Sequence, residues 1–163
     1  MRKKKIKILH EENGRCEAAE VAALCLANLY NSGGHRKITP DEYETIKKYL
    51  QKFPESMHIR AAFIIASEAI YSPSAEYKRV PDKIINKAKQ WSEQYPKKIE
   101  FQEAYFGLLF SRLKYAQAQD MRNEQRRVYR EMKTVAERAN YSEYNESNQL
   151  MESVDILHRV FGY

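Results

Sequence analysis

The feature that most constrains the fold is the spacing of apolar residues, which follows a helical period along almost the whole chain. Five glycines and five prolines make up about 6% of the chain, against roughly 12% in ordinary proteins, which disfavours a turn-rich β-sandwich or barrel. The period predicts an all-α fold. The expected helices are 16–31, 40–53, 57–71, 81–95, 98–118, 121–140 and 146–161.

Helix ends carry local signals. Thr39-Pro40-Asp41-Glu42 has the pattern of a capping box with proline at the first helical position, and it predicts a helix start. Ser32-Gly33-Gly34 predicts the end of the preceding helix, because glycine readily adopts the left-handed conformation found there. Pro54 and Pro96 predict the ends of two further helices.

The helices alternate in character. Segments 16–31, 57–71 and 98–118 are apolar on several faces, whereas each following segment has one apolar stripe. Stacked hairpins satisfy both patterns, since inner helices are then covered on more than one side. We therefore expect three stacked antiparallel helical hairpins, with 146–161 as a C-terminal capping helix whose outer side is polar. An irregular helical bundle is the competing architecture.

A repeat spacing supports the stacked arrangement. The pairs Phe53-Pro54 and Tyr95-Pro96 lie 42 residues apart, and the helix starts at Pro40 and Pro81 lie 41 apart. Helical arrays commonly repeat at such intervals.

The net charge of +6 is unevenly distributed. Arg2, Lys3, Lys4, Lys5 and Lys7 carry most of the excess, which leaves 23 basic residues against 22 acidic ones in the rest of the chain. This predicts a basic arm over 1–13 and a single helical-repeat domain over 14–163. The arm has three interpretations: a solubilising terminus, which we favour, a short edge strand, or a segment that binds polyanions.

The cysteines and the hydropathy of the chain indicate its cellular location. Cys16 and Cys25 lie nine residues apart in one expected helix, on opposite faces, so they cannot pair with each other and are expected in the core. The longest apolar run, 21–27, is far shorter than the roughly 20 residues of a membrane span. These features predict a cytoplasmic protein without a membrane span.

Some of these residues resemble a known family. Leu26-Ala27-Asn28-Leu29-Tyr30, followed by Gly33-Gly34 and closed by Pro54, resembles a degenerate tetratricopeptide repeat. Ala104-Tyr105-Phe106-Gly107 with Phe110 is a second partial match, and Ile65-Ala66 is a weaker third. The likeness covers about 16–140. The spacing near 40 and the long loops 32–38 and 72–79 depart from the family's 34-residue repeat.

The resemblance implies a concave groove, lined by the inner helices, that holds a peptide or protein segment. The residues expected to face the groove are Asn28, Asn31, Arg60, Phe63, Ser67 and Ser111. Some family members clamp a terminal carboxylate with polar side chains. Apolar or aromatic residues occupy those positions here, so binding of chaperone tails is disfavoured: Leu24, Ile64, Phe101 and Tyr105.

Chemistry-bearing motifs are missing from the sequence. His10, His35, His58 and His158 have no metal-ligand spacing, and the chain contains neither H-E-x-x-H nor Cys-x-x-Cys. We therefore expect a non-catalytic scaffold or adaptor that uses no metal or cofactor. The sequence makes no prediction of the oligomeric state.

Nucleic-acid binding is the alternative function. It would use the basic arm and the positively charged face of the helix over 122–130, where Glu124 and Glu131 dilute the positive charge. The residues expected to contact nucleic acid are Arg2, Lys3, Lys4, Lys5, Lys7, Arg126, Arg127 and Arg130.

Overall fold

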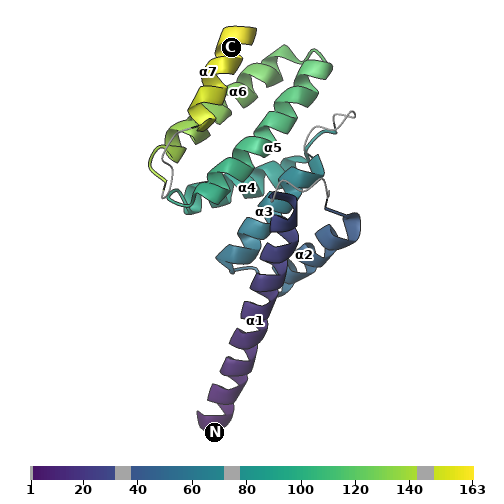
Figure 1. Ribbon diagram of the computed structural model, residues 1–163, viewed down its shortest axis with the longest axis vertical. Coiled ribbons are helices and arrows are strands. Elements are labelled where there is room, and N and C mark those ends of the chain that lie inside the picture. Colours follow the sequence, from purple (N-terminus) through teal and green to yellow (C-terminus); the bar gives the residue numbers. More distant parts are fainter. Residues whose placement is uncertain (1, 32–37, 72–77, 143–148) are drawn as a thin grey trace. The chain divides into compact units, whose positions relative to one another are not determined.

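The computed structural model is all-α (Figure 1). It describes residues 2–31, 38–71, 78–142 and 149–163, with side chains over the same ranges except 2–11 and 28–31. Within these ranges there are seven helices and no strand. They are α1 (Arg2–Asn31), α2 (Pro40–Lys52), α3 (Met57–Tyr71), α4 (Asp82–Gln94), α5 (Ile99–Ala118), α6 (Arg122–Ala139) and α7 (Gln149–Phe161).

The chain divides into two compact units, Met1–Ala66 and Ser67–Tyr163, with the boundary inside α3. Each unit is described on its own. The single domain over 14–163 remains a prediction.

Six of the seven helices lie within a few residues of their predicted bounds, and α1 is the exception. It begins at Arg2, so the basic segment continues the same helix and does not form the edge strand that was one of its three interpretations. Lysine, arginine and glutamate are good helix formers, and no proline interrupts this segment. The turn predicted at Ser32-Gly33-Gly34 lies outside the described residues.

In the first unit, α1 packs on α2. The predicted capping box at the start of α2 is confirmed: Glu42 N donates to Thr39 Oγ1 (3.2 Å) and Thr39 N donates to Glu42 Oε2 (2.9 Å). The predicted apolar stripe buries Tyr43, Ile46 and Leu50. The Tyr43 ring stacks on Phe63 of α3 with the ring centres 5.8 Å apart.

The turns α2–α3 and α4–α5 have the same backbone geometry. Phe53 has φ −128° and ψ 65°, and Tyr95, 42 positions later, has φ −120° and ψ 60°. Each donates its N–H four residues back, to Tyr49 and Trp91 respectively. The proline that follows in each turn cannot continue a helix, which explains why both helices end here.

A buried polar side chain stabilises each of these turns through hydrogen bonds to backbone carbonyls. Arg60 of α3 donates from Nε to Pro54 O (2.8 Å). Gln102 of α5, also 42 positions later, donates from Nε2 to Ser92 O (2.9 Å) and Tyr95 O (3.1 Å). The two positions therefore have a similar role, which is to donate to carbonyls at or just after the end of the preceding helix.

In the second unit, α5 lies between α4 and α6, and α7 packs on α6 (Figure 1). The prediction that α5 is covered on several faces is confirmed by the burial of Phe101, Tyr105, Leu108 and Leu113. The flanking helix α6 buries one stripe, as predicted, at Val128, Met132 and Val135 among others. In this arrangement the polar sides of α4 and α6 both lie next to α5.

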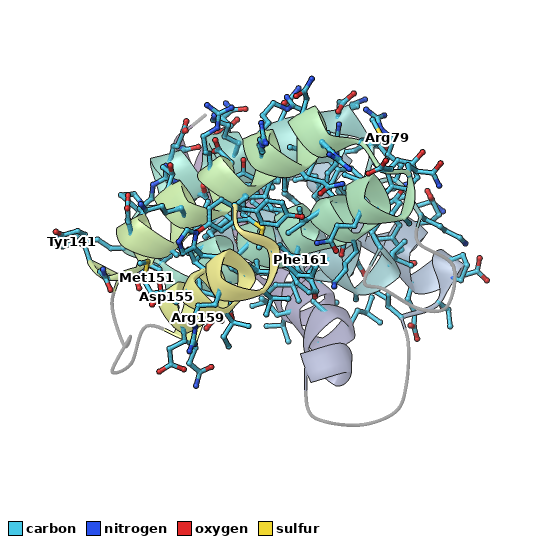
Figure 2. The ribbon with its side chains drawn as sticks, turned by 90° about the horizontal axis from the view of Figure 1, so that it is seen from above. Arg79, Tyr141, Met151, Asp155, Arg159 and Phe161 are labelled. Carbon is cyan, nitrogen blue, oxygen red and sulfur yellow. The ribbon has the colours of Figure 1, made fainter. Side chains whose placement is uncertain are left out.

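The outer side of α7 differs from the prediction. Val154 and Leu157 are buried, but Ile156 and Val160 are 52% and 64% exposed, so the side expected to be polar also carries two aliphatic residues. Asp155 and Arg159, which immediately precede them in the sequence, are exposed as well (Figure 2). Their spacing places these aliphatic residues outside the stripe that faces α6.

The cysteines are less buried than predicted. Cys16 is half-buried and Cys25 is exposed, so the expectation that both lie in the core is wrong. Val21 on the same helix is also exposed, which shows that the apolar circumference of α1 is not fully covered. Among the described helices, none has an apolar stretch long enough to cross a lipid bilayer.

Candidate functional site

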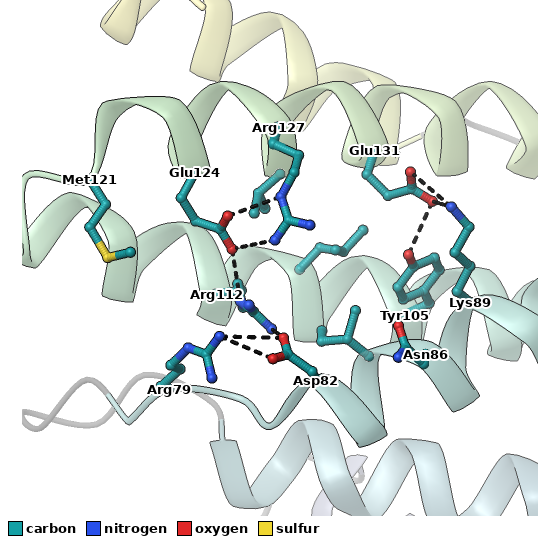
Figure 3. A pocket seen from close by; sticks show the side chains of 13 residues that line it. Arg79, Asp82, Asn86, Lys89, Tyr105, Arg112, Met121, Glu124, Arg127 and Glu131 are labelled. Carbon is teal, nitrogen blue, oxygen red and sulfur yellow. Dashed lines mark hydrogen bonds and ion pairs between the residues drawn. The ribbon is translucent and has the colours of Figure 1, made fainter.

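The second unit contains a pocket of about 470 Å³, which we call the α4–α5–α6 pocket (Figure 3). Helix α5 forms its floor, and α4 and α6 form its walls. Its lining residues are Arg79, Asp82, Ile85, Asn86, Lys89, Tyr105, Leu109, Arg112, Met121, Glu124, Arg127, Val128 and Glu131.

Helical spacing explains why these residues face one another. The α4 wall consists of Asp82, Ile85, Asn86 and Lys89, which recur every three or four positions and so share one face. The floor and the α6 wall have the same spacing. The apolar lining residues are Ile85, Leu109, Met121 and Val128, of which Leu109 and Val128 are buried and Met121 is exposed. The charged residues form two groups, one around Arg112 and the other around Glu131 (Figure 3).

Arg112 is the centre of the larger charged group. Its side chain is only 5% exposed, although it belongs to the helix whose other buried residues are mostly apolar. The guanidinium contacts Asp82 Oδ1 through Nη1, donates from Nε to Glu124 Oε1 (3.1 Å) and donates from Nη1 to Val80 O (3.2 Å). A buried cation requires such partners, because burial without them costs several kcal/mol.

Two exposed arginines extend this group. Arg79 donates from Nη2 to Asp82 Oδ2 (3.2 Å), and Arg127 donates from Nε and Nη2 to the two oxygens of Glu124 (2.9 and 2.7 Å). The result is an alternating series, Arg79–Asp82–Arg112–Glu124–Arg127, which we call the charge chain (Figure 3). It contains three arginines and two carboxylates and therefore carries a net charge of +1.

The arginines change the pKa values of both carboxyl groups. Hydrogen bonding to Arg112, with its charge, lowers the pKa of Asp82. Hydrogen bonding to Arg127 is the largest of the effects that lower the pKa of Glu124. Both groups are therefore ionised at neutral pH and poorly suited to proton transfer there, whereas fixed charges of this kind suit ligand recognition.

The second charged group lies at the opposite side of the pocket. Tyr105 donates its hydroxyl to Glu131 Oε1 (3.1 Å), and Lys89 Nζ lies 3.3 Å from the same oxygen. Burial raises the pKa of the Tyr105 hydroxyl, which therefore remains a hydrogen-bond donor at neutral pH. This group has no net charge, in contrast to the charge chain.

The predicted groove residues have other surroundings. Arg60, Phe63, Ser67 and Ser111 are buried. Arg60 fastens its turn and pairs with Glu55, Phe63 stacks on Tyr43, and Ser111 donates to Gly107 O within its own helix. These four side chains do not line the α4–α5–α6 pocket. The side chains of Asn28 and Asn31 lie outside the described residues.

Of the residues predicted to contact nucleic acid, Arg126, Arg127 and Arg130 are exposed on α6. Arg127 lines the pocket and is paired with Glu124, while Arg130 donates from Nε to Arg126 O. The side chains of Arg2, Lys3, Lys4, Lys5 and Lys7 lie outside the described residues.

Sequence reasoning missed most of the pocket. The polar positions Asp82, Asn86 and Lys89 recur at helical spacing on α4, and this pattern was a usable signal for one wall. Arg112 has no comparable signal, because its partners lie 30 residues before it and 12 residues after it in the chain. The part of the chain with described side chains contains no group of three histidine, cysteine or acidic residues placed to hold a metal ion.

Comparisons with protein-family models, with curated proteins and with solved structures gave no match. The geometry of the α4–α5–α6 pocket is therefore the basis for the functional argument.

Proposed function

We propose that the protein is a non-catalytic interaction module of the cytoplasm that binds a peptide or protein segment in the α4–α5–α6 pocket. The single observation that carries this proposal is the composition of the pocket: apolar surface from Met121 and Ile85, together with two fixed charged groups. Recognition sites commonly combine apolar surface, which provides affinity, with a few positioned polar groups, which provide specificity.

The size and rigidity of the pocket support this proposal. About 470 Å³ accommodates one or two side chains of a bound segment. The charged residues are already held by ion pairs, so binding would require little further ordering of these side chains.

The proposal includes a helical-repeat architecture similar to that of tetratricopeptide repeats. The equivalent turns at Phe53 and Tyr95, and the equivalent positions of Arg60 and Gln102, support a structural repeat of 42 residues. Repeat proteins of this kind use their stacked helices as binding surfaces.

Selection from a library of random displayed peptides tests the proposed function. Asn86→Arg would place a long side chain in the pocket without altering the core, because Asn86 is an exposed residue of the α4 wall. We expect peptides selected on the wild-type protein to bind this variant at least about tenfold more weakly, as measured by fluorescence polarisation.

Gln90→Arg is the matched control, since Gln90 is exposed on the same helix and does not line the pocket. It should bind the selected peptides like the wild type. Selection of no peptide, or equal binding by the Asn86→Arg variant, would contradict the proposed function.

Nucleic-acid binding is a second candidate, favoured by Arg126 and Arg130, whose exposed side chains lie one turn apart on α6. Fluorescence anisotropy with a labelled single-stranded oligonucleotide tests it. Binding that falls steeply with salt and weakens in an Arg126→Gln/Arg130→Gln variant would support this function. Absent or salt-insensitive binding would contradict it.

A further inference from the structure

The arrangement of the charge chain indicates which kind of ligand the pocket binds. Both of its ends are arginines, and both ends are accessible: the side chains of Arg79 and Arg127 are 46% and 66% exposed. The three inner members, Asp82, Arg112 and Glu124, each already contact two oppositely charged partners. The two terminal arginines are therefore the members of the charge chain that can bind a ligand.

The terminal arginines have donors beyond those used within the chain. In their hydrogen bonds to other described residues, Arg79 donates only from Nη2, and Arg127 donates only from Nε and Nη2. A guanidinium has five N–H donors in a planar arrangement that matches a carboxylate. Since the charge chain has a net charge of +1, one additional carboxylate would neutralise it.

Apolar surface lies next to this end of the pocket at Met121, which is 43% exposed and precedes Glu124 by three residues (Figure 3). Ile85 of α4 also lines the pocket and is partly exposed, whereas Leu109 and Val128 are each only 3% exposed. A ligand that places its anion at the terminal arginines therefore places a neighbouring group against apolar side chains. The opposite side, at Lys89, Tyr105 and Glu131, is already neutral and offers no comparable attraction for an anion.

From this arrangement we infer that the pocket recognises a peptide segment in which an acidic side chain lies within two positions of a large apolar one. The acidic side chain binds at the terminal arginines of the charge chain, and the apolar side chain packs on Met121 and Ile85. This inference rests on the proposed function and specifies the chemistry of its ligand.

Two peptide libraries test the inference. Both consist of peptides blocked at each end, so that no terminal carboxylate is present. Every member of the first carries leucine followed by glutamate, and every member of the second carries leucine followed by glutamine. We expect the wild-type protein to bind the glutamate set about tenfold more tightly, because charge-assisted hydrogen bonds to arginine are stronger than neutral ones.

Three variants locate the preference. Arg79→Gln and Arg127→Gln should each reduce it, and the double variant should abolish it. Arg126→Gln is the matched control, because it removes the same charge from an exposed position on α6 that does not line the pocket. It should keep the preference for glutamate.

The outcomes separate the inference from the proposed function. Equal binding of both libraries, blocked by Asn86→Arg, would overturn the acidic preference and leave peptide binding in the pocket intact. Failure of both libraries to bind, or binding that Asn86→Arg does not reduce, would contradict the proposed function as well. Equal loss of preference in Arg126→Gln would show a general charge effect and overturn the inference. Displacement of the peptides by a single-stranded oligonucleotide would assign the pocket to phosphate and also overturn it.

Discussion

Gly107 of α5 lies directly against the side chain of Glu68 of α3. A Cβ atom built on Gly107 would lie 2.6 Å from Glu68 Cγ and 2.9 Å from Glu68 Oε1, closer than side chains tolerate. Glycine within a helix costs about 1 kcal/mol relative to alanine. Its presence at this position allows the Glu68 side chain to lie against α5.

We expect Gly107→Ala to lower the free energy of unfolding by about 1 kcal/mol, because the cost of overpacking exceeds the gain in helix propensity. In a Glu68→Ala background, which removes the clashing atoms, the same substitution should instead raise it by about 1 kcal/mol. Urea denaturation of the four proteins of this double-mutant cycle measures both effects. An equal effect of Gly107→Ala in both backgrounds would show that the contact with Glu68 has no energetic role.

Gln102 should contribute to stability through its hydrogen bonds to the α4–α5 turn. Gln102→Leu keeps most of the buried volume but leaves the carbonyls of Ser92 and Tyr95 without this donor. We expect the free energy of unfolding to fall by about 1–3 kcal/mol, as measured by chemical denaturation. Gln90→Leu, at an exposed position, is the control and should change it by less than about 0.5 kcal/mol. Equal stability of the two variants would contradict the role assigned to Gln102.

Arg112 should link stability to pH. Its hydrogen bond and charge lower the pKa of Asp82, so the folded state favours the ionised carboxyl group. This stabilisation is full above the ordinary aspartate pKa of about 4 and is lost as the pH falls through the lowered value. Carboxyl NMR titration should show that Arg112→Met moves the pKa of Asp82 back upward. The pKa of Glu124 should move less, because Arg127 remains beside it.

The same substitution should reduce stability at neutral pH. Arg112→Met leaves Val80 O without this donor and removes one cation from the partly buried Glu124, for which we expect a loss of about 2 kcal/mol in the free energy of unfolding. Arg126→Met is the exposed control and should have little effect. A pKa of Asp82 that does not rise in the Arg112→Met variant would contradict the assigned cause.

The two cysteines should differ in reactivity. Cys25 is exposed, whereas Cys16 is half-buried and donates its thiol to Glu20, and burial is the first of several effects that raise its pKa. Because the thiolate is the reactive form, a thiol reagent such as Ellman's should modify Cys25 first. Two kinetic phases are expected in the wild type, and Cys25→Ser should remove the faster one. Loss of the slower phase in that variant would contradict the assignment.

Most helix positions could be predicted because their signals are local. The capping box at Thr39 and Glu42 and the prolines that follow Phe53 and Tyr95 act within one or two turns of the backbone. The burial of α5 on several faces also followed from its composition. The start of α1 differs from the prediction because the charge pattern sets the basic residues apart as an arm, although these residues are compatible with a helix.

The candidate site was predicted much less well, since it depends on contacts between helices. Arg60 was expected to face a groove, but its guanidinium instead satisfies the carbonyl of Pro54 and pairs with Glu55. Cys25 was expected in the core because α1 is apolar around its circumference, and the structure leaves it exposed. Apolar character predicts what a side chain favours, not whether a neighbour is present to cover it.

The sequence by itself determined that this chain is helical, where six of its helices lie, and that a turn recurs after 42 residues, because each property depends on neighbours along the backbone. Only the tertiary structure decided that Arg112 is buried between Asp82 and Glu124 and that the three residues join two further arginines at one pocket. The physical reason is that a charged side chain is stable inside a helical bundle only where packed helices bring opposite charges to it. That pairing depends on how the helices lie against one another, which their separate periodicities do not specify.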